Sequence, residues 1–209
     1  MFKIELVGAG KRYNQDWIFR DLDTTFQSGD STAILGGNGS GKSTFLRAVT
    51  GYTPLSKGSI VYSFNDQIVQ QDEAYAYFSY CAPYLELYEE LSLDELADFH
   101  FSLKKPIEGF EAKRFSEAIG LESASKKAIK YFSSGMKQRV RIGLAVYSDV
   151  AVICLDEPTS NLDRKAIEWY RETIETNKKD RIVLVASNKQ EDEYFFCTEK
   201  INVENYKPS

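Results

Sequence analysis

The sequence has few cysteines, one histidine and no long hydrophobic run. Its cysteines, Cys81, Cys154 and Cys197, are odd in number, far apart and without CxxC spacing. This pattern suggests neither a disulfide framework nor a zinc site, and it favours reduced thiols in the cytosol. No apolar run approaches the roughly 18 residues that span a bilayer, and residues 1–10 contain no uninterrupted apolar region of a signal peptide. We therefore expect a cytoplasmic chain that meets a membrane only through another protein.

Positive charge is not in excess either. The sequence has 26 Lys and Arg against 31 Asp and Glu, which gives a net charge of −5. Because proteins that gain affinity by neutralising phosphates are usually basic, we expect no nucleic-acid partner. The composition is otherwise that of a globular protein, with 43% hydrophobic and 27% charged residues. A chain of this length buries about 70% of its unfolded surface, so it needs no disulfide or metal to hold a core.

Hydrophobic periodicity predicts strands at both ends of the chain and helices in the middle. The expected strands lie around Ile4 and Leu6 and over 17–26, 31–35, 59–64, 75–80, 150–155 and 181–186, with a strand-like piece at 201–203. The expected helices cover 43–50, 91–103, 110–121, 134–147 and 164–176. The continuous apolar run VAVICL at 150–155 is typical of a parallel strand buried on both faces. An α/β fold with a parallel core and inserted helices follows.

A glycine-rich loop stands between the strand at 31–35 and the next helix. Residues 36–43 read GGNGSGKS and match G-x-x-x-x-G-K-[ST] in the context that this motif requires. Its backbone N–H groups and the positive end of the helix suit phosphate oxygens. The Lys42 ammonium can reach the β and γ phosphates, and the Ser43 hydroxyl can bind Mg²⁺. We therefore assign nucleotide binding to Gly36, Asn38, Gly39, Ser40, Gly41, Lys42, Ser43 and Thr44.

An acidic pair follows the buried strand VAVICL. Asp156 ends this run, and Glu157 comes directly after it. Beside a phosphate-binding loop, Asp156 is expected to hold Mg²⁺ through water, and Glu157 to polarise an attacking water molecule. Without such a loop, an Asp-Glu pair after a strand is usually only the start of a loop.

Two further segments make the sequence recognisable. Residues 156–163, DEPTSNLD, resemble the Walker B and D-loop run of ATP-binding cassette (ABC) proteins, and residues 133–139, SSGMKQR, resemble the ABC signature. The resemblance covers about residues 2–205 in the family's order of motifs. It implies one nucleotide-binding domain, 1–209, with a P-loop NTPase core of mostly parallel sheet and an N-terminal antiparallel β subdomain. The implied core comprises 1–81 and 136–209, and the inserted α-helical subdomain comprises 82–135.

The resemblance also implies a head-to-tail dimer, formed with a second copy or with a paralogous cassette. ATP would lie between the P-loop of one subunit and the signature of the other. Ser133 and Gly135 would contact the γ-phosphate of the opposite nucleotide, Asp163 would contact the partner's P-loop region, and Tyr13 would stack on adenine. Three of these residues have a plainer interpretation: Ser133 and Asp163 as helix N-caps, and Tyr13 as a turn residue packed against Trp17.

Several positions depart from the family's pattern. The switch histidine is replaced by Asn188, whose amide donates a hydrogen bond but carries no proton near neutral pH, which predicts slowed hydrolysis. The family's Q-loop glutamine falls near Ala82 or Pro83, and neither side chain positions water or Mg²⁺. Met136 stands where the signature usually has glutamine. The only histidine, His100, lies in the predicted helical block, where a structural role is the expectation.

Tyrosines crowd the segment around the missing glutamine: Tyr75, Tyr77, Tyr80, Tyr84 and Tyr88. Acidic residues follow them over 86–95. In the family this border binds a short coupling helix of the membrane subunit, and tyrosine is favoured at interfaces. The resemblance implies a basic or amphipathic helix as the partner. The plainer alternative is that the tyrosines face the core and the acids face water.

The function implied is that of the ATP-binding and hydrolysing subunit of an ABC transporter. It would dimerise on MgATP and drive a separate membrane permease from the inner face of the membrane. Glu157, Lys42 and Asn188 are the expected catalytic residues, Ser43 and Asp156 the metal ligands, and ATP and Mg²⁺ the cofactors. An N-K-x-D run at 177–180 would suggest GTP, but it precedes its strand instead of following it. Two alternatives stay open: a soluble ABC ATPase in translation or DNA repair, and a catalytically weak ATP-sensing cassette.

Overall fold

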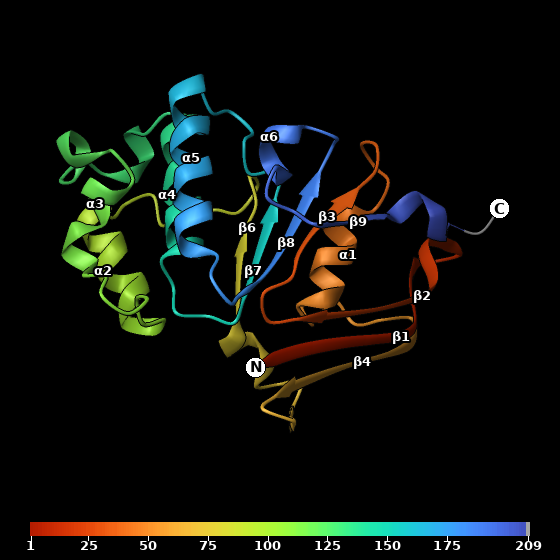
Figure 1. Cartoon of the computed structure of the whole chain (residues 1–209). Coiled ribbons are helices and arrows are strands. Elements are labelled where there is room, and N and C mark those ends of the chain that lie inside the picture. Colours follow the sequence, from red (N-terminus) through yellow and green to blue (C-terminus); the bar gives the residue numbers. More distant parts are fainter. Residues whose placement is uncertain (208–209) are drawn as a thin grey trace.

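Two sheets and a group of helices make up the computed structural model, which describes residues 1–207 (Figure 1). The last two residues of the predicted domain, 208–209, lie outside the described residues. The antiparallel sheet has the order β2 (Asp16–Gln27), β1 (Phe2–Tyr13), β4 (Lys57–Phe64), β5 (Gln67–Val69). The parallel sheet has the order β6 (Phe78–Cys81), β7 (Val152–Asp156), β8 (Ile182–Ser187), β3 (Ser31–Leu35), β9 (Glu199–Asn202). This arrangement confirms the expected fold class.

Helix α1 (Lys42–Val49) lies between the two sheets, as Figure 1 shows. Its side chains Phe45 and Leu46 are fully buried in a cluster that includes Phe19 of β2 and Leu184 of β8. The rings of Phe19 and Phe45 meet edge to face, with centroids 5.4 Å apart. Since burying one such side chain stabilises the fold by about 1.5–3 kcal/mol, these contacts fix the helix that follows the glycine-rich loop.

Three helices cover the opposite face of the parallel sheet: α4 (Ser134–Val146), α5 (Arg164–Asn177) and α6 (Glu191–Tyr194). Ile142 of α4 and Ile174 of α5 pack in one cluster with strand residues such as Ile153. Tyr170 of α5 is fully buried, and its hydroxyl donates to the carbonyl oxygen of Glu193 at 2.6 Å. The central strands β7 and β8 are therefore buried on both faces, as the run VAVICL predicts for β7.

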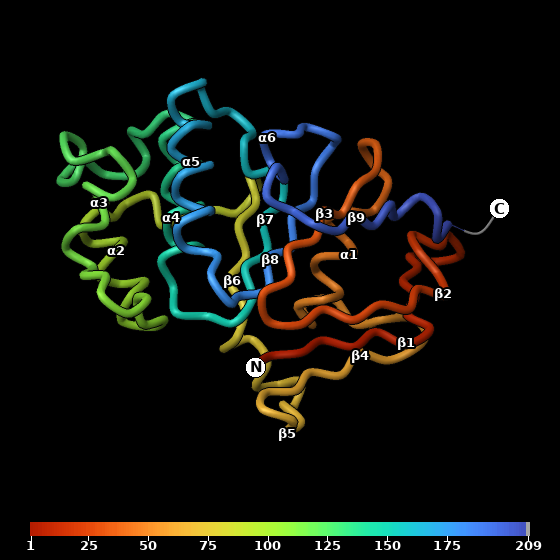
Figure 2. The backbone as a smooth tube through the Cα atoms, in the orientation of Figure 1, coloured from red at the N-terminus to blue at the C-terminus, as the bar shows by residue number. Residues whose placement is uncertain are grey.

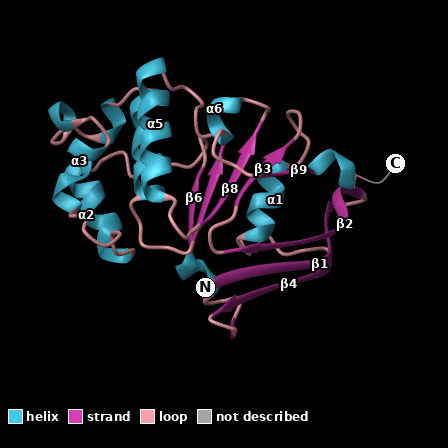
Figure 3. Cartoon of the chain, in the orientation of Figure 1, coloured by secondary structure: helices cyan, strands magenta, loops and turns pink. Residues whose placement is uncertain are grey.

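The remaining helices gather at one side of the molecule (Figure 3). They are α2 (Leu93–Leu103), α3 (Phe115–Ala118) and the 3₁₀ turns Ala112–Arg114, Glu122–Ala124 and Ile129–Tyr131. Their side chains form a core of their own, in which Phe101 and Phe115 meet edge to face. Val140 and Leu144 of α4 belong to this core, so α4 joins it to the sheet. The limits 82–135 for a helical subdomain stay a prediction.

Two predicted elements are wrong in part. The strand expected over 75–80 begins only at Phe78, because residues 74–77 form a 3₁₀ turn in which Tyr77 stacks on Phe2 at 4.9 Å between centroids. The helix expected over 110–121 is reduced to Phe115–Ala118. Phe110 instead stacks on Tyr147, 4.3 Å between centroids, and Gly120 ends the segment at φ +66°.

β5 and α6 were not predicted, and they are only three and four residues long. β1 and β2 also run for 12 residues each, longer than the short strands expected. At the end of the described chain, the 3₁₀ turn Val203–Tyr206 lies beside β2 (Figure 2). Within residues 1–207, none of the helices combines the length and apolarity that crossing a bilayer requires.

Candidate functional site

The glycine-rich loop joins the end of β3 to the start of α1 and closes around the Lys42 side chain. This side chain is 5% exposed, and its Nζ donates to the carbonyl oxygens of Gly36 at 3.1 Å and Gly37 at 3.0 Å. The Ser40 N–H also donates to the Gly37 carbonyl, at 3.1 Å. The ammonium group is thus held inside the loop, at the place where the motif predicts a phosphate ligand.

Two positions of this loop require glycine. Gly36 and Gly41 have φ +156° and +107°, values that residues with a side chain rarely adopt. A Cβ on Gly36 would collide with the Ser40 side chain, and one on Gly41 would collide with Ile18 of β2. At these two positions the loop backbone packs against the Ser40 and Ile18 side chains, and only glycine leaves room for this.

Helix α1 has an uncapped N-terminus. In the described part of the chain, no side chain accepts a hydrogen bond from its first turn, and that turn contains no acidic residue. The first N–H groups of a helix lack partners within it and carry the positive end of its dipole. At α1 these groups belong to Lys42, Ser43 and Thr44, so the loop opens onto an anion-binding helix end.

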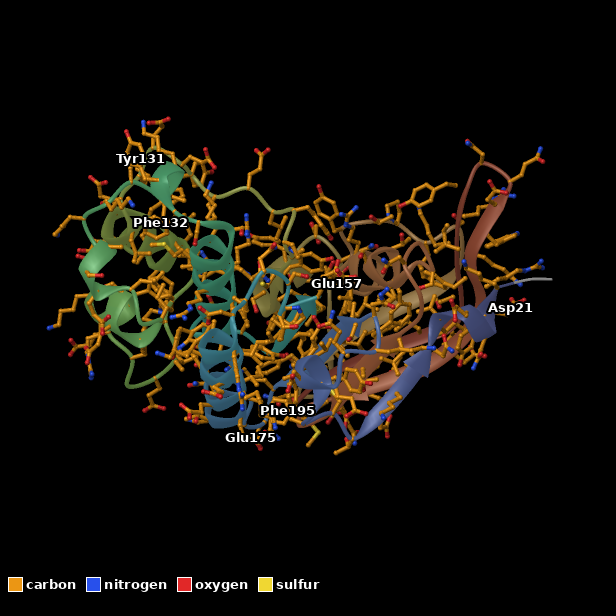
Figure 4. All side chains as sticks on the ribbon, turned by 90° about the horizontal axis from the view of Figure 1, so that it is seen from above. Asp21, Tyr131, Phe132, Glu157, Glu175 and Phe195 are labelled. Atoms are coloured by element: carbon orange, nitrogen blue, oxygen red, sulfur yellow. The ribbon has the colours of Figure 1, made fainter. Side chains whose placement is uncertain are left out.

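The acidic pair lies at the end of β7, next to the loop. Asp156 is 2% exposed, whereas the Glu157 side chain is 40% exposed and its Oε1 lies 4.0 Å from Lys42 Nζ. Glu157 still donates its N–H to the Ala186 carbonyl at 2.9 Å, but its φ of +46° is left-handed. Such a conformation is unfavourable for a residue with a side chain and is concentrated at functional sites. Figure 4 shows Glu157 near the middle of the molecule.

A cavity of about 560 Å³ brings these groups together. Its lining residues are Ser43, Pro83, Tyr84, Asp156, Glu157, Ser160 and Asn161. A hydroxyl and two carboxylates are the hard oxygen donors that Mg²⁺ prefers, and this ion usually takes one or two protein carboxylates besides phosphate oxygens. The residues present therefore fit a magnesium nucleotide, and the structure places the expected ligands Ser43 and Asp156 on one cavity.

Two tyrosines bind the buried carboxylate, a feature that the sequence analysis missed. The hydroxyls of Tyr80 and Tyr84 lie 3.2 and 3.0 Å from Asp156 Oδ2 and 2.8 Å from each other. Burial raises the pKa of Tyr80 well above its ordinary value, so this phenol keeps its proton. Tyr80 lies in β6 and Tyr84 just after it, and β6 pairs in parallel with β7, a pairing that no local pattern in the sequence indicates.

The signature residues form the N-terminus of α4. The Ser133 Oγ accepts a hydrogen bond from the Met136 N–H at 3.2 Å, and the Asp163 Oδ1 accepts one from the Ala166 N–H at 2.8 Å. Both helix N-caps are thus confirmed. Gly135 has a structural reason to be glycine, because a Cβ there would lie 2.8 Å from the Asn161 carbonyl oxygen.

A second cavity, of about 430 Å³, is lined by Ser133 and Gly135, which are expected to contact the partner's nucleotide, and by Asp163, which is expected to contact the partner's P-loop region. It is lined by Gly120, Leu121, Ser133, Ser134, Gly135, Met136, Arg139, Asn161, Asp163 and Ala166. No P-loop residue within 1–207 lines it, and only Asn161 lines both cavities. The structure therefore groups Ser133, Gly135 and Asp163 apart from the P-loop of the same chain.

The other expected site residues stand apart. Tyr13 is 47% exposed with the Lys11 ammonium 5.0 Å from its ring centroid, whereas Arg12 and Arg20 lie against Trp17. Its adenine-stacking role stays a prediction. Asn188 is exposed and follows β8, which lies between β7 and β3 in the sheet. This strand order places it between the acidic pair and the glycine-rich loop.

His100 lies away from these groups. Its Nε2 is 2.8 Å from the Ser148 Oγ, and that hydroxyl donates to the Leu144 carbonyl at 2.6 Å. Burial lowers the pKa of His100, so the neutral ring is favoured. The expected structural role agrees with these contacts.

Known proteins that are similar to this chain match it over the region that contains these motifs. Residues 19–160 match the family model described as ABC transporter. Over 177 residues the chain is 30% identical to the phospholipid-transporting ATPase ABCA3 of Rattus norvegicus, covering 81% of this chain and 10% of that protein. Over 193 residues it is 28% identical to the linearmycin resistance ATP-binding protein LnrL of Bacillus subtilis, covering 90% of this chain and 61% of LnrL. The chain thus spans only part of both relatives.

Among solved structures, the fold is similar to that of the ATP-binding cassette MJ0796, whose structure is described as a dimer in a post-hydrolysis state bound to ADP and Pi. The TM-score is 0.79 at 19% identity, covering 96% of this chain and 94% of that one. This likeness extends the agreement in fold over nearly the whole chain.

Proposed function

The chain belongs to the ABC transporter family, and from this premise we propose that it binds ATP with Mg²⁺, hydrolyses it to ADP and phosphate, and so drives a separate membrane permease. The observation that carries the proposal is the single cavity shared by Ser43, Asp156 and Glu157 beside the uncapped N-terminus of α1. Phosphate, metal and water each have a group of suitable chemistry there.

The polar groups in and beside this cavity would have distinct roles. Lys42 would exchange its contacts with the carbonyls of Gly36 and Gly37 for the β and γ phosphate oxygens. The first N–H groups of α1 would bind phosphate, and Ser43 and Asp156 would hold the metal. When bound, Mg²⁺ neutralises phosphate charge. Glu157, which lines the cavity, would orient water and accept its proton.

A second polypeptide would complete the site. Ser133, Gly135 and Asp163 line the cavity of about 430 Å³ that has no P-loop of its own, and the N-terminus of α4 offers N–H groups to an anion. A head-to-tail dimer would set this cavity against the partner's nucleotide. The MJ0796 cassette is described as a dimer, which supports this arrangement for the present chain with itself or with a paralogous cassette.

The permease is proposed to dock over a third cavity, of about 540 Å³. Its lining residues are Arg47, Thr50, Gly51, Tyr52, Gln71, Tyr75, Phe78, Tyr80, Tyr84 and Leu85. Of the five tyrosines in the predicted docking segment, Tyr75, Tyr80 and Tyr84 line the cavity. The other two do not: Tyr77 stacks on Phe2, and Tyr88 packs edge to face on Phe99. An amphipathic helix of the permease fits this surface, and such docking would hold the cassette at the cytoplasmic face of a membrane.

Calorimetric titration of the purified protein with ATP tests the proposal. We expect one nucleotide bound per chain, tighter binding with Mg²⁺ than in EDTA, and weaker binding of GTP. On the same sample, the rate of phosphate release is expected to rise with the fraction of chains that have MgATP bound. Absence of heat with MgATP would contradict the proposed function, and equal affinity for ATP and GTP would contradict the adenine preference.

Replacing Asn188 by His is expected to raise the hydrolysis rate by roughly tenfold or more, because a positioned proton-transfer group contributes about 10²–10⁴-fold. Asn188 follows the strand between the acidic pair and the P-loop, but its amide cannot carry a proton. Steady-state phosphate release at saturating MgATP measures the effect, with Asn177→His at the end of α5 as the control. An unchanged rate would favour the ATP-sensing alternative.

A further inference from the structure

The strongest feature outside the sequence motifs is the pair of phenols on Asp156. Tyr80 ends in a hydroxyl beside Oδ2, and Tyr84 reaches the same oxygen from the segment after β6. Within residues 1–207 these hydroxyls are the hydrogen-bond donors to the Asp156 side chain, and both use Oδ2. The second oxygen, Oδ1, therefore keeps its lone pairs for a metal or its bound water.

The number of hydroxyl hydrogens limits which hydrogen bonds the two tyrosines can form with Asp156. Three oxygens stand within 2.8 to 3.2 Å of each other, but each phenol has only one hydrogen. Either both hydroxyls donate to Asp156, or one donates to the other and that one donates to Asp156. In each case the carboxylate receives at least one hydrogen bond. The two phenols can therefore replace one another, and losing one leaves a donor in place.

The rings are held independently of these bonds. The Tyr84 ring lies under the Arg47 guanidinium, 4.8 Å from Cζ to centroid, and Arg47 belongs to α1. Tyr80 lies in β6, which pairs with β7 through Tyr80 opposite Cys154. A change from Tyr to Phe at either position thus removes the hydroxyl and keeps the ring contacts.

The geometry points to Tyr80 and Tyr84 as a redundant pair of positioning residues that hold the Asp156 carboxylate for Mg²⁺, and so set the metal affinity of the nucleotide site. This inference rests on the proposed function, because it concerns the metal bound with ATP. Groups that hydrogen-bond a metal-binding carboxylate fix its orientation, and their removal typically lowers metal affinity by about 10- to 100-fold. The redundancy predicts that this loss appears only when both hydroxyls are gone.

The test measures Mg²⁺ binding through its effect on fluorescent ATP binding. Affinity for the nucleotide is measured in EDTA and over a Mg²⁺ series for the wild type, Tyr80→Phe, Tyr84→Phe and the double variant. We expect each single variant to stay within about threefold of wild type in its half-saturating Mg²⁺, and the double variant to need about tenfold more or above. Binding in EDTA is expected to stay the same in all four proteins.

Tyr62→Phe is the matched control, since it also removes one tyrosine hydroxyl bond, from Tyr62 to the Val49 carbonyl at 2.9 Å, at the C-terminal end of α1 and not at Asp156. The inference is overturned by a double variant with unchanged or higher Mg²⁺ affinity, by full loss in one single variant, or by the same loss in Tyr62→Phe. It is also overturned if EDTA binding falls together with Mg²⁺ binding. A wild type that binds no ATP would instead refute the proposed function.

Discussion

Glu157→Gln is expected to lower steady-state ATP hydrolysis by roughly 100-fold or more while MgATP affinity stays within about threefold, since general base catalysis contributes about 10²–10⁴-fold. The carboxylate at the mouth of the cavity lies 4.0 Å from the Lys42 ammonium, at a residue held with φ +46°. Glutamine keeps its size and shape but accepts no proton from water. Phosphate release at saturating nucleotide, beside calorimetric affinity, measures the separation of rate from binding.

The same variant should accumulate the nucleotide-bound dimer, because ATP that is not hydrolysed keeps the composite site closed. Size-exclusion chromatography with MgATP is the measurement. Glu172→Gln, an exposed carboxylate of α5 outside the cavity, provides the control and should hydrolyse ATP like the wild type. Equal rates for Glu157→Gln and wild type would mean that Glu157 is no general base, and would favour the ATP-sensing alternative.

The second large effect is expected on binding. Lys42→Ala should weaken MgATP binding by about 10- to 150-fold, because each hydrogen bond to a charged group contributes about 1.5–3 kcal/mol. The buried ammonium donates to the carbonyls of Gly36 and Gly37, so its loss also removes hydrogen bonds that hold the glycine-rich loop. Calorimetric titration with MgATP measures the change, and thermal unfolding separates it from loss of fold.

Lys57→Ala is the matched control for this loss. Its ammonium pairs with Asp21 between β4 and β2, on the exposed side of the antiparallel sheet. Removing it takes one lysine from the chain without touching the glycine-rich loop. Unchanged affinity in Lys42→Ala, or an equal loss in Lys57→Ala, would contradict the assignment of the phosphate contact to Lys42.

The nucleotide cavity could be predicted wherever the chemistry is local in sequence. The glycine-rich motif at 36–43 predicts its own backbone geometry, and the apolar run before Asp156 predicts a buried strand that ends at a carboxylate. Tyr84 could not be found in this way, since its contact with Asp156 spans 72 residues and depends on β6 pairing with β7. The family pattern predicts a glutamine amide near Ala82, and the sequence has none there, whereas the structure places the hydroxyls of Tyr80 and Tyr84 on Asp156.

The errors in the fold have a similar origin. The apolar period over 110–121 is genuine, but Phe110 stacks on Tyr147, a residue of the α4 end that no local pattern identifies. Likewise Tyr77 is drawn out of the expected strand by Phe2 near the N-terminus. In both places an aromatic pair far apart in sequence overrides local propensity.

Asn161 lies between the P-loop cavity and the signature cavity. It lines the cavity of Glu157 as well as that of Ser133, and its carbonyl oxygen lies 2.8 Å from the place that a Cβ of residue 135 would take. A shift of the Asn161 backbone on ligand binding in one cavity would therefore change the lining of the other cavity as well. In the proposed dimer, this coupling would link ATP hydrolysis at one nucleotide site to hydrolysis at the other.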